Sequence, residues 1–154
     1  MNLWDWAVAA YGAPGVADAC LALQDHHEQN VHLLLWSAWI AETRRLPDEE
    51  TIEAACDTAR AWDGVVTAPL RAVRRTLKAP VPDIDDGPRE AVRERIKAIE
   101  FEAERHLLEA LEALAPAAGG SKRAAIDGLV ATARVWSSLT PRPALIRLAE
   151  ARPA

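Results

Sequence analysis

Three of the chain's four histidines and two of its six tryptophans lie in the stretch LQDHHEQNVHLLLWSAW, residues 23–39. Imidazoles beside carboxylates can bind a transition metal or act as general acid and base. At about 100° per residue, however, Asp25, His26 and Glu28 point in different directions around a helix. They therefore cannot converge on one ion, and the segment contains neither an HExxH nor an ExxH motif. The sequence predicts no metal site.

One pair of histidines can still meet. His27 falls at the end of one predicted helix on its apolar side, and His32 opens the next helix across a short turn. A pocket there would lie near Trp36 and Trp39, with Trp62 contributing from a later helix, and could take a small ligand or a substrate. The other interpretation is structural, with a half-buried His27 whose ring nitrogens bond to nearby backbone. The absence of ligand spacing favours the structural interpretation.

No other combination of side chains indicates catalysis. The chain has neither a GxSxG nucleophile elbow nor a glycine-rich phosphate loop. Glu100 and Glu104 lie on one helical face and can pair as acid and base. Glutamates interleaved with basic residues more commonly form solvated salt bridges along a helix. We therefore predict no catalytic residue and no cofactor.

Four cations follow i, i+3, i+4, i+7 spacing and form a basic stripe: Arg71, Arg74, Arg75 and Lys78. Like charges at i,i+4 repel by roughly 0.2–0.5 kcal/mol per pair, so the stripe favours an anionic neighbour. That neighbour can be internal, either the loop that carries Asp83, Asp85 and Asp86 or the pair Glu100 and Glu104. It can also be an acidic protein surface, a phosphate-bearing ligand or nucleic acid. Internal pairing or plain solvation is the commoner outcome, and the sequence leaves both open.

Helices must position these side chains, because alanine and leucine dominate the chain and no strand-like alternation occurs. The stretch APVPDIDDGP, residues 79–88, is the clearest loop. Gly64 and Pro69 predict a kink within the fourth helix. We expect helices over roughly residues 2–11, 14–28, 30–46, 47–78, 88–115, 122–138 and 143–151.

The helix over about 30–46 should lie at the centre of the molecule. It is apolar on all sides from Val31 to Ala41, and a helix that is apolar all round is buried. The sequence predicts an all-α bundle of six to seven helices around it. Residues 1–118 should form the core domain. Residues 119–154 should form a weaker helical tail, packed on the core or appended to it, because glycines and prolines interrupt that segment.

Composition narrows the class of protein. A chain of 154 residues fits one domain, and its net charge of −5 argues against bulk nucleic-acid binding. Two cysteines without a CxxC motif indicate free thiols. The longest apolar run, residues 31–41, is too short to span a bilayer, and the N-terminus lacks the basic region of a signal peptide. We expect a cytoplasmic protein.

Three stretches carry a resemblance to a known family: YGAPGVADACLALQDHHEQNVHLLLWSAWIA, AWDGVVTAPLRAVRRTLK, and the E...ER..L pattern of Glu100, Glu104, Arg105 and Leu108. Together they resemble a family of small proteobacterial proteins of unknown function, over roughly Leu3 to Leu114. The resemblance implies a bacterial, cytoplasmic, helical protein and supplies no activity. Members of that family often have Asn in place of His32 and a glycine-containing turn in place of HHEQN, which agrees with a structural role for the histidines.

The function that the sequence predicts is a non-enzymatic interaction module, an adaptor or a regulator. The longest predicted helix, residues 88–115, presents one apolar seam with three-four spacing: Ile96, Ile99, Ala103, Leu107, Ala110 and Leu114. The module would act through the basic stripe or an exposed part of this seam, on an acidic protein surface or another anionic partner, and a homodimer is compatible with the pattern. The alternative is a small-ligand-binding protein or an enzyme with a pocket near His27, Trp36, Trp39 and Trp62. The partner and the pathway do not follow from the sequence.

Overall fold

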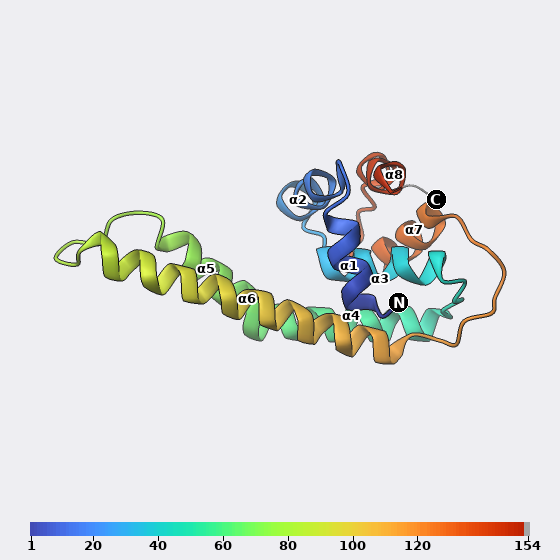
Figure 1. Ribbon diagram of the computed structural model, residues 1–154. Helices are drawn as coiled ribbons and strands as arrows, with labels where there is room; N and C mark the ends of the chain where they lie inside the picture. The colour runs from blue at the N-terminus through green and yellow to red at the C-terminus, as the bar shows by residue number, and fades with distance from the viewer. Residues whose placement is uncertain (153–154) are drawn as a thin grey trace.

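The computed structural model describes residues 1–152, and within that range every regular element is a helix (Figure 1). The α-helices and one π-helical turn (η1) are α1 (Leu3–Tyr11), α2 (Val16–His27), α3 (Val31–Glu42), α4 (Glu49–Trp62), η1 (Asp63–Thr67), α5 (Ala68–Thr76), α6 (Asp86–Leu114), α7 (Ala125–Trp136) and α8 (Arg142–Ala151). Because α4, η1 and α5 follow one another without a break, these elements make seven helical segments. The predicted all-α bundle is confirmed.

Local sequence signals explain where the helices begin and bend. The Asn30 side chain accepts a hydrogen bond from the Leu33 amide at 3.0 Å and so caps α3, as an N-cap asparagine does. Asp48 caps α4 in the same way through the Thr51 amide at 2.8 Å. Where the sequence predicts a kink around Gly64 and Pro69, the structure has the π-helical turn η1, followed by α5 with Pro69 in its first turn. Such π turns are single-turn insertions in otherwise regular helices.

The central position predicted for the third helix is also confirmed. In α3 every residue from Leu33 to Ala41 is buried, and Trp36 and Trp39 have almost no exposed surface. The helix ends at Glu42 rather than near residue 46, because Arg44 adopts a left-handed backbone conformation with φ of 57°. Among its neighbours, α3 packs most extensively against α7.

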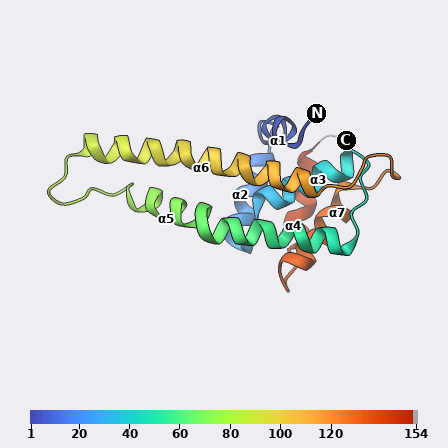
Figure 2. The same cartoon turned by 90° about the horizontal axis from the view of Figure 1, so that it is seen from below.

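The helices α4, η1, α5 and α6 form one long antiparallel hairpin, residues 49–114, which we call the long hairpin (Figures 1 and 2). Its far end, residues 68–99, projects beyond the other helices and is called the arm. Within the arm only Arg89 is buried. Its guanidinium donates to the Leu77 carbonyl at 2.7 Å and pairs with Asp86 at 3.1 Å, which ties the end of α5 to the start of α6.

The predicted tail is packed on the rest of the bundle. Leu129 and Ala133 of α7 and Leu145 of α8 are fully buried in the same core as the tryptophans of α3. The boundary at residue 118 falls in the long connection between α6 and α7. That the tail is less stable than the remainder stays a prediction.

Within residues 1–152, one bent pair of helices meets the length and composition of a membrane span. Among the described residues no single helix has both the length and the apolar character to cross a bilayer. The helices α1 and α2 reach the required length and composition only together, across a bend of 97°.

Candidate functional site

The structure does not bring the predicted histidine and tryptophan pocket together. Trp36 and Trp39 fill the core, and His27 is exposed at the end of α2. Trp62 is half-buried and donates from Nε1 to the Ala103 carbonyl at 2.9 Å. Of the five residues assigned to that pocket, His32 lines a cavity to which the other four do not contribute.

The basic stripe pairs largely within the chain. Arg74 Nε lies 2.6 Å from Glu100 Oε2, which is one of the internal partners that the sequence suggested. Arg71 Nη2 lies 3.8 Å from Asp63 Oδ1, and Arg75 Nη2 lies 3.7 Å from Asp25 Oδ1. Neither of these two aspartates belongs to the loop at residues 83–86. Lys78 is exposed, and no ion pair of it is found in the part of the chain that the structure describes.

A cleft of about 510 Å³ lies where the arm joins the rest of the molecule, and it is the candidate site. The helices α1, α2, α3, α5 and α6 all contribute to it. One wall is apolar and aromatic, and its main residues are Trp4, Val8, Tyr11, Leu21 and Phe101. The other wall is polar, with His32, Arg71, Arg74, Glu100 and Glu104.

Helical spacing explains how the apolar wall forms. In α1 the core takes Leu3, Trp6, Ala7 and Ala10. Residues 4, 8 and 11 then follow i, i+4, i+7 spacing on a neighbouring flank, which the structure turns toward the cleft. The Trp4 ring meets the Phe101 ring edge-on, with centroids 5.0 Å apart, and Arg105 lies 5.5 Å over the Trp4 ring. These contacts fix the rim of the cleft between α1 and α6.

The polar wall is a set of paired charges with unequal spacing. The short Arg74–Glu100 contact neutralises Glu100, which is buried. His32 Nε2 stands 3.7 Å from Glu104 Oε2, and Arg71 stands 3.8 Å from Asp63, so both pairs are too long for a direct hydrogen bond. Arg71 and Glu104 therefore keep hydrogen-bonding capacity toward the cleft.

Tyr11 adds a neutral hydroxyl to the apolar wall. Burial, reinforced by nearby negative groups such as Glu104, raises the pKa of this phenol above its usual value. The hydroxyl therefore stays protonated at neutral pH and can both donate and accept a hydrogen bond. The cleft as a whole is suited to hold an apolar group beside a polar or charged one.

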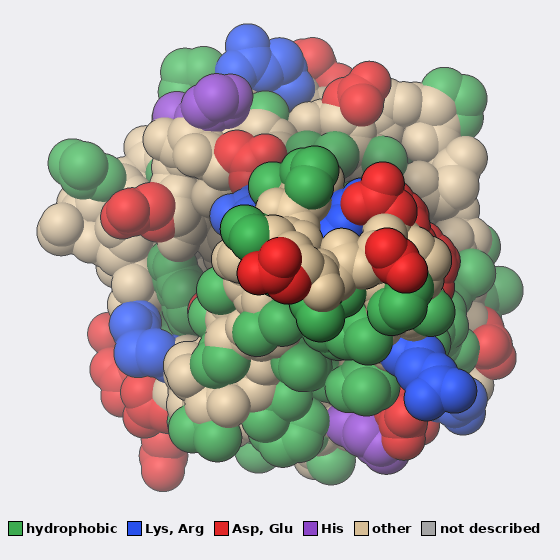
Figure 3. All heavy atoms as spheres, turned by 90° about the vertical axis from the view of Figure 1, so that its left-hand side faces the viewer, with side chains coloured by type: hydrophobic (Ala, Val, Ile, Leu, Met, Phe, Trp, Pro, Cys, Tyr) green, Lys and Arg blue, Asp and Glu red, His purple; other side chains and the backbone are tan. Residues whose placement is uncertain are grey.

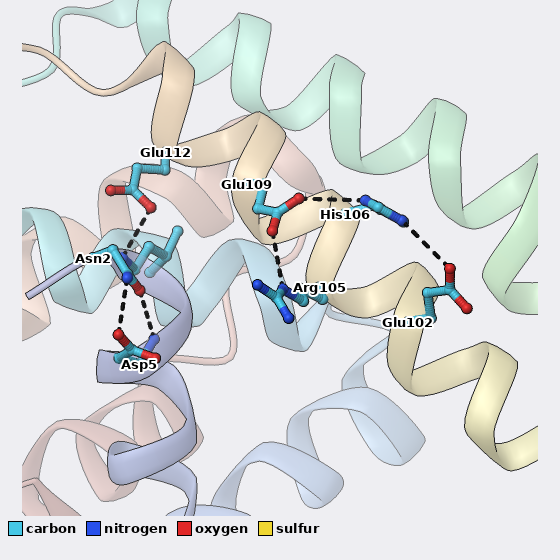
Figure 4. A network of polar contacts seen from close by, with 8 residues as sticks. Asn2, Asp5, Glu102, Arg105, His106, Glu109 and Glu112 are labelled. Carbon is cyan, nitrogen blue, oxygen red and sulfur yellow. Dashed lines mark hydrogen bonds and ion pairs between the residues drawn. The ribbon is translucent and has the colours of Figure 1, made fainter.

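A second cluster of titratable side chains lies on the solvent side of α6 (Figure 4). His106 stands 3.3 Å from Glu109 and 3.8 Å from Glu102, and Arg105 donates to Glu109 at 3.0 Å. Hydrogen bonds from Arg105 and His106 lower the pKa of Glu109. These are exposed contacts between neighbouring turns of one helix, so they form no enclosed site.

A metal site does not emerge from the geometry either. Within residues 1–152 no three side chains of His, Cys, Asp or Glu gather in a way that could hold an ion. Sequence reasoning singled out Glu100 and Glu104 but missed the aromatic residues of α1. The signal available for them was the flank of α1 at residues 4, 8 and 11, which carries large side chains outside the core spacing.

Comparison with known proteins places the chain in a family without supplying a reaction. A search of curated proteins and a search of solved structures each returned no match. A family model described as "Protein of unknown function (DUF2390)" matches residues 2–111. That range contains every residue that lines the cleft and ends before α7 and α8. The chain belongs to this family of proteins of unknown function.

Proposed function

We propose that this protein is a non-enzymatic binding module whose cleft takes a segment of a partner protein that carries an apolar side chain close to an acidic one. The observation that carries the proposal is the pairing of an open apolar wall with Arg71 across one cleft. The protein would then act as an adaptor or a regulator on an acidic partner, and the basic stripe would contribute through Arg71, Arg75 and Lys78.

The apolar wall supports the first half of this proposal. Val8, Leu21 and Phe101 line the cleft, yet each of them is about half exposed. Contiguous exposed apolar surface marks binding sites more often than isolated apolar residues do. Burying one leucine or phenylalanine side chain of a partner there would contribute about 1.5–3 kcal/mol.

The charges on the polar wall support the acidic half. Glu100 is neutralised by Arg74 at 2.6 Å, whereas Arg71 lies 3.8 Å from Asp63. A partner carboxylate can therefore compete for the Arg71 guanidinium, which binds carboxylates in a two-pronged geometry. Arg75 and Lys78 lie further along the same stripe and are exposed, so they would attract the same partner over about 8 Å at physiological ionic strength.

An enzyme is the second candidate, and one contact favours it. His32 lies beside Glu104 in the cleft, at 3.7 Å, and a histidine oriented by a carboxylate is a common general base. No serine, threonine or cysteine is among the residues that line the cleft. The hydroxyl group among them is the Tyr11 phenol, and its raised pKa makes it a poor nucleophile at neutral pH. A binding role uses all of the cleft, whereas the catalytic role uses only this pair.

Selection from a random peptide library on the immobilised full-length protein tests the proposal. We expect the bound peptides to be enriched in sequences with a large apolar residue and an Asp or Glu within a few positions. Leu21→Glu should abolish binding of those peptides, and Arg71→Glu should weaken it by roughly tenfold, or about 1.4 kcal/mol.

Two surface variants serve as matched controls. Arg147→Glu reverses an exposed charge on α8, and Leu139→Glu changes an exposed leucine, and neither residue lines the cleft. Both controls should bind the selected peptides as the unchanged protein does. Peptides without acidic enrichment, or peptides that bind the Arg71→Glu protein equally well, would refute the acidic-partner proposal.

A further inference from the structure

One broad face of the molecule is left uncovered by the fold. The helices α1, α3 and α7 pack against the long hairpin from one side only (Figure 1). Seen from below in Figure 2, α4, α5 and α6 lie in front of the other helices. We call this surface of the long hairpin the outer face. The cleft lies on the other side of α6, because its residues Glu100, Phe101, Glu104 and Leu108 occupy the opposite flank of that helix.

The outer face carries a row of exposed apolar side chains. Val65, Val73, Val92 and Ile99 are between 48 and 77 % exposed. A groove of about 500 Å³ extends the row toward α4 and is lined mainly by Trp62, Val65, Leu107 and Ala110. Viewed end on, the arm has hydrophobic side chains gathered around and below its tip (Figure 3).

The register of the hairpin places these residues on one surface. The Arg89 side chain of α6 donates to the Leu77 carbonyl at the end of α5, and the Trp62 side chain of α4 donates to the Ala103 carbonyl of α6. The two helical arms of the hairpin therefore run antiparallel. Val92 and Ile99 are seven residues apart and so share one face of α6, and Val65 lies beside Leu107 and Ala110 of α6 in the groove. The row therefore continues from the tip of the arm to the groove at its base.

Two exposed side chains of opposite charge flank Ile99 on α6 and can pair with their counterparts in a second copy of the chain. Arg95 and Glu102 are seven residues apart, so they project from nearly the same side of α6, on either side of Ile99. Both are exposed. Glu102 faces only His106 of its own helix, at 3.8 Å, and Arg95 forms no ion pair in the part of the chain that is described. If two α6 helices cross antiparallel next to Ile99, each Arg95 meets the Glu102 of the other copy, and the same contact occurs twice.

We propose that two copies of this chain associate through the outer face, with α6 antiparallel to α6, to form a four-helix layer. A two-fold interface requires one surface to be complementary to itself, and the Arg95–Glu102 arrangement around an apolar centre has that property. Packing of this kind is the usual way in which two-helix hairpins bury their free faces.

The area available is sufficient for a stable dimer. The helix α6 has 29 residues. Its length is thus about 43 Å, and a face two helices wide spans on the order of 800 Å², which is what one partner contributes to a standard interface. Burial of Val65, Val92 and Ile99 at the centre would give this interface the apolar core typical of homodimers.

Sedimentation equilibrium over a range of protein concentrations tests the proposal. The unchanged full-length protein should show reversible association to the mass of two chains. Ile99→Arg, which places four cations of two copies at the centre of the interface, should make the protein monomeric. Leu139→Arg changes an exposed leucine outside the outer face and should leave the dimer intact.

A charge exchange makes the test specific for the antiparallel register. Arg95→Glu and Glu102→Arg should each weaken dimerisation by roughly tenfold. The double variant restores both pairs with the charges reversed, so it should recover the dissociation constant of the unchanged protein to within about threefold. Circular dichroism checks that every variant remains helical. A protein that is monomeric at all concentrations, or a double variant no better than the single ones, would overturn the proposal. Neither result would affect peptide binding in the cleft, which lies on the other flank of α6.

Discussion

At the residue scale, two buried hydroxyl groups join the central helix to α7. Thr132 Oγ1 donates to Ser37 Oγ at 3.0 Å, and both side chains are buried. Gly128, one turn before Thr132, allows this approach: a Cβ atom there would stand 3.3 Å from Ser37 Oγ and 3.4 Å from the Ser37 carbonyl oxygen. The contact therefore sets the distance between α3 and α7.

Removing one hydroxyl of this pair should destabilise the protein more than removing both. Thr132→Val leaves the Ser37 hydroxyl buried without its partner, at a cost of about 1–3 kcal/mol. The double variant Ser37→Ala, Thr132→Val leaves no unpaired hydroxyl, so its loss should be smaller than the sum of the single losses. Urea denaturation of the four proteins measures the three differences, and strictly additive values would show that the hydrogen bond contributes nothing.

The two thiols should be unreactive in the folded protein. Burial raises the pKa of Cys20 to about 12 and that of Cys56 to about 11. Because only the thiolate reacts, Ellman's reagent at neutral pH should label neither cysteine faster than the chain opens. Rapid labelling of one thiol in the native protein would contradict this expectation.

The same two groups predict how stability changes in alkali. Their folded-state pKa values lie above the unfolded value of about 8.5, so the folded state binds more protons. The stabilisation is fully present below about pH 8.5 and is lost as the pH rises toward 11–12. The urea midpoint should fall over that interval, and a midpoint that stays constant up to pH 11 would show that the thiols are not protected by burial.

At the element scale, the sequence specified the helices because their signals are local. The cap at Asn30 and the all-round apolar character of residues 31–41 both appear in the structure as α3. The predicted apolar seam of the longest helix is only half buried. Ala103 and Leu107 reach the core, whereas Ile99 is 49 % exposed because the arm has no third helix to cover it. Periodicity indicates which side of a helix is apolar but does not show how far a neighbour extends along it.

The cap of α3 should contribute measurably to stability. Asn30→Ala removes the acceptor of the Leu33 amide, and loss of such a cap costs about 0.5–2 kcal/mol. Asn30→Ser retains a side-chain oxygen at the same position and should lose clearly less. Thermal unfolding followed by circular dichroism compares the two, and equal melting temperatures for both variants would show that the hydrogen bond is not the source of the effect.

At the scale of the whole molecule, the candidate site could not be predicted because it has no local signature. The cleft depends on Trp4, His32, Arg71 and Glu104, which come from four different helices and lie far apart in the chain. Each belongs to an ordinary helical pattern, and only the packing of the helices brings them together. The clustered histidines lie at the end of α2, at His26 and His27, and in the first turn of α3, at His32.

The packing of α7 and α8 on residues 1–118 determines how we expect the molecule to unfold. The connection between α6 and α7, residues 115–124, contains no helix. The helices α7 and α8 nevertheless place Leu129, Val130, Leu145 and Leu148 in the common core. Because α7 covers one side of the buried helix α3, residues 1–118 alone should expose the surface around Ser37 and Ala41. Because burial of apolar surface is the main source of cooperative stability, exposing this surface of α3 should weaken the cooperativity of unfolding.

A chain that ends at residue 118 should therefore keep helical circular dichroism but lose a sharp thermal transition. Adding residues 119–154 as a separate fragment should restore the transition, because the missing helices pack by non-covalent contacts with α2, α3 and α4. Limited proteolysis of the full-length protein should cut first in the connection at residues 115–124, which lies outside the helices. If residues 1–118 melt as sharply as the whole protein and within a few degrees of it, then α7 and α8 are an independent addition to a self-sufficient core, and the single buried core described for this molecule is not what holds the chain together.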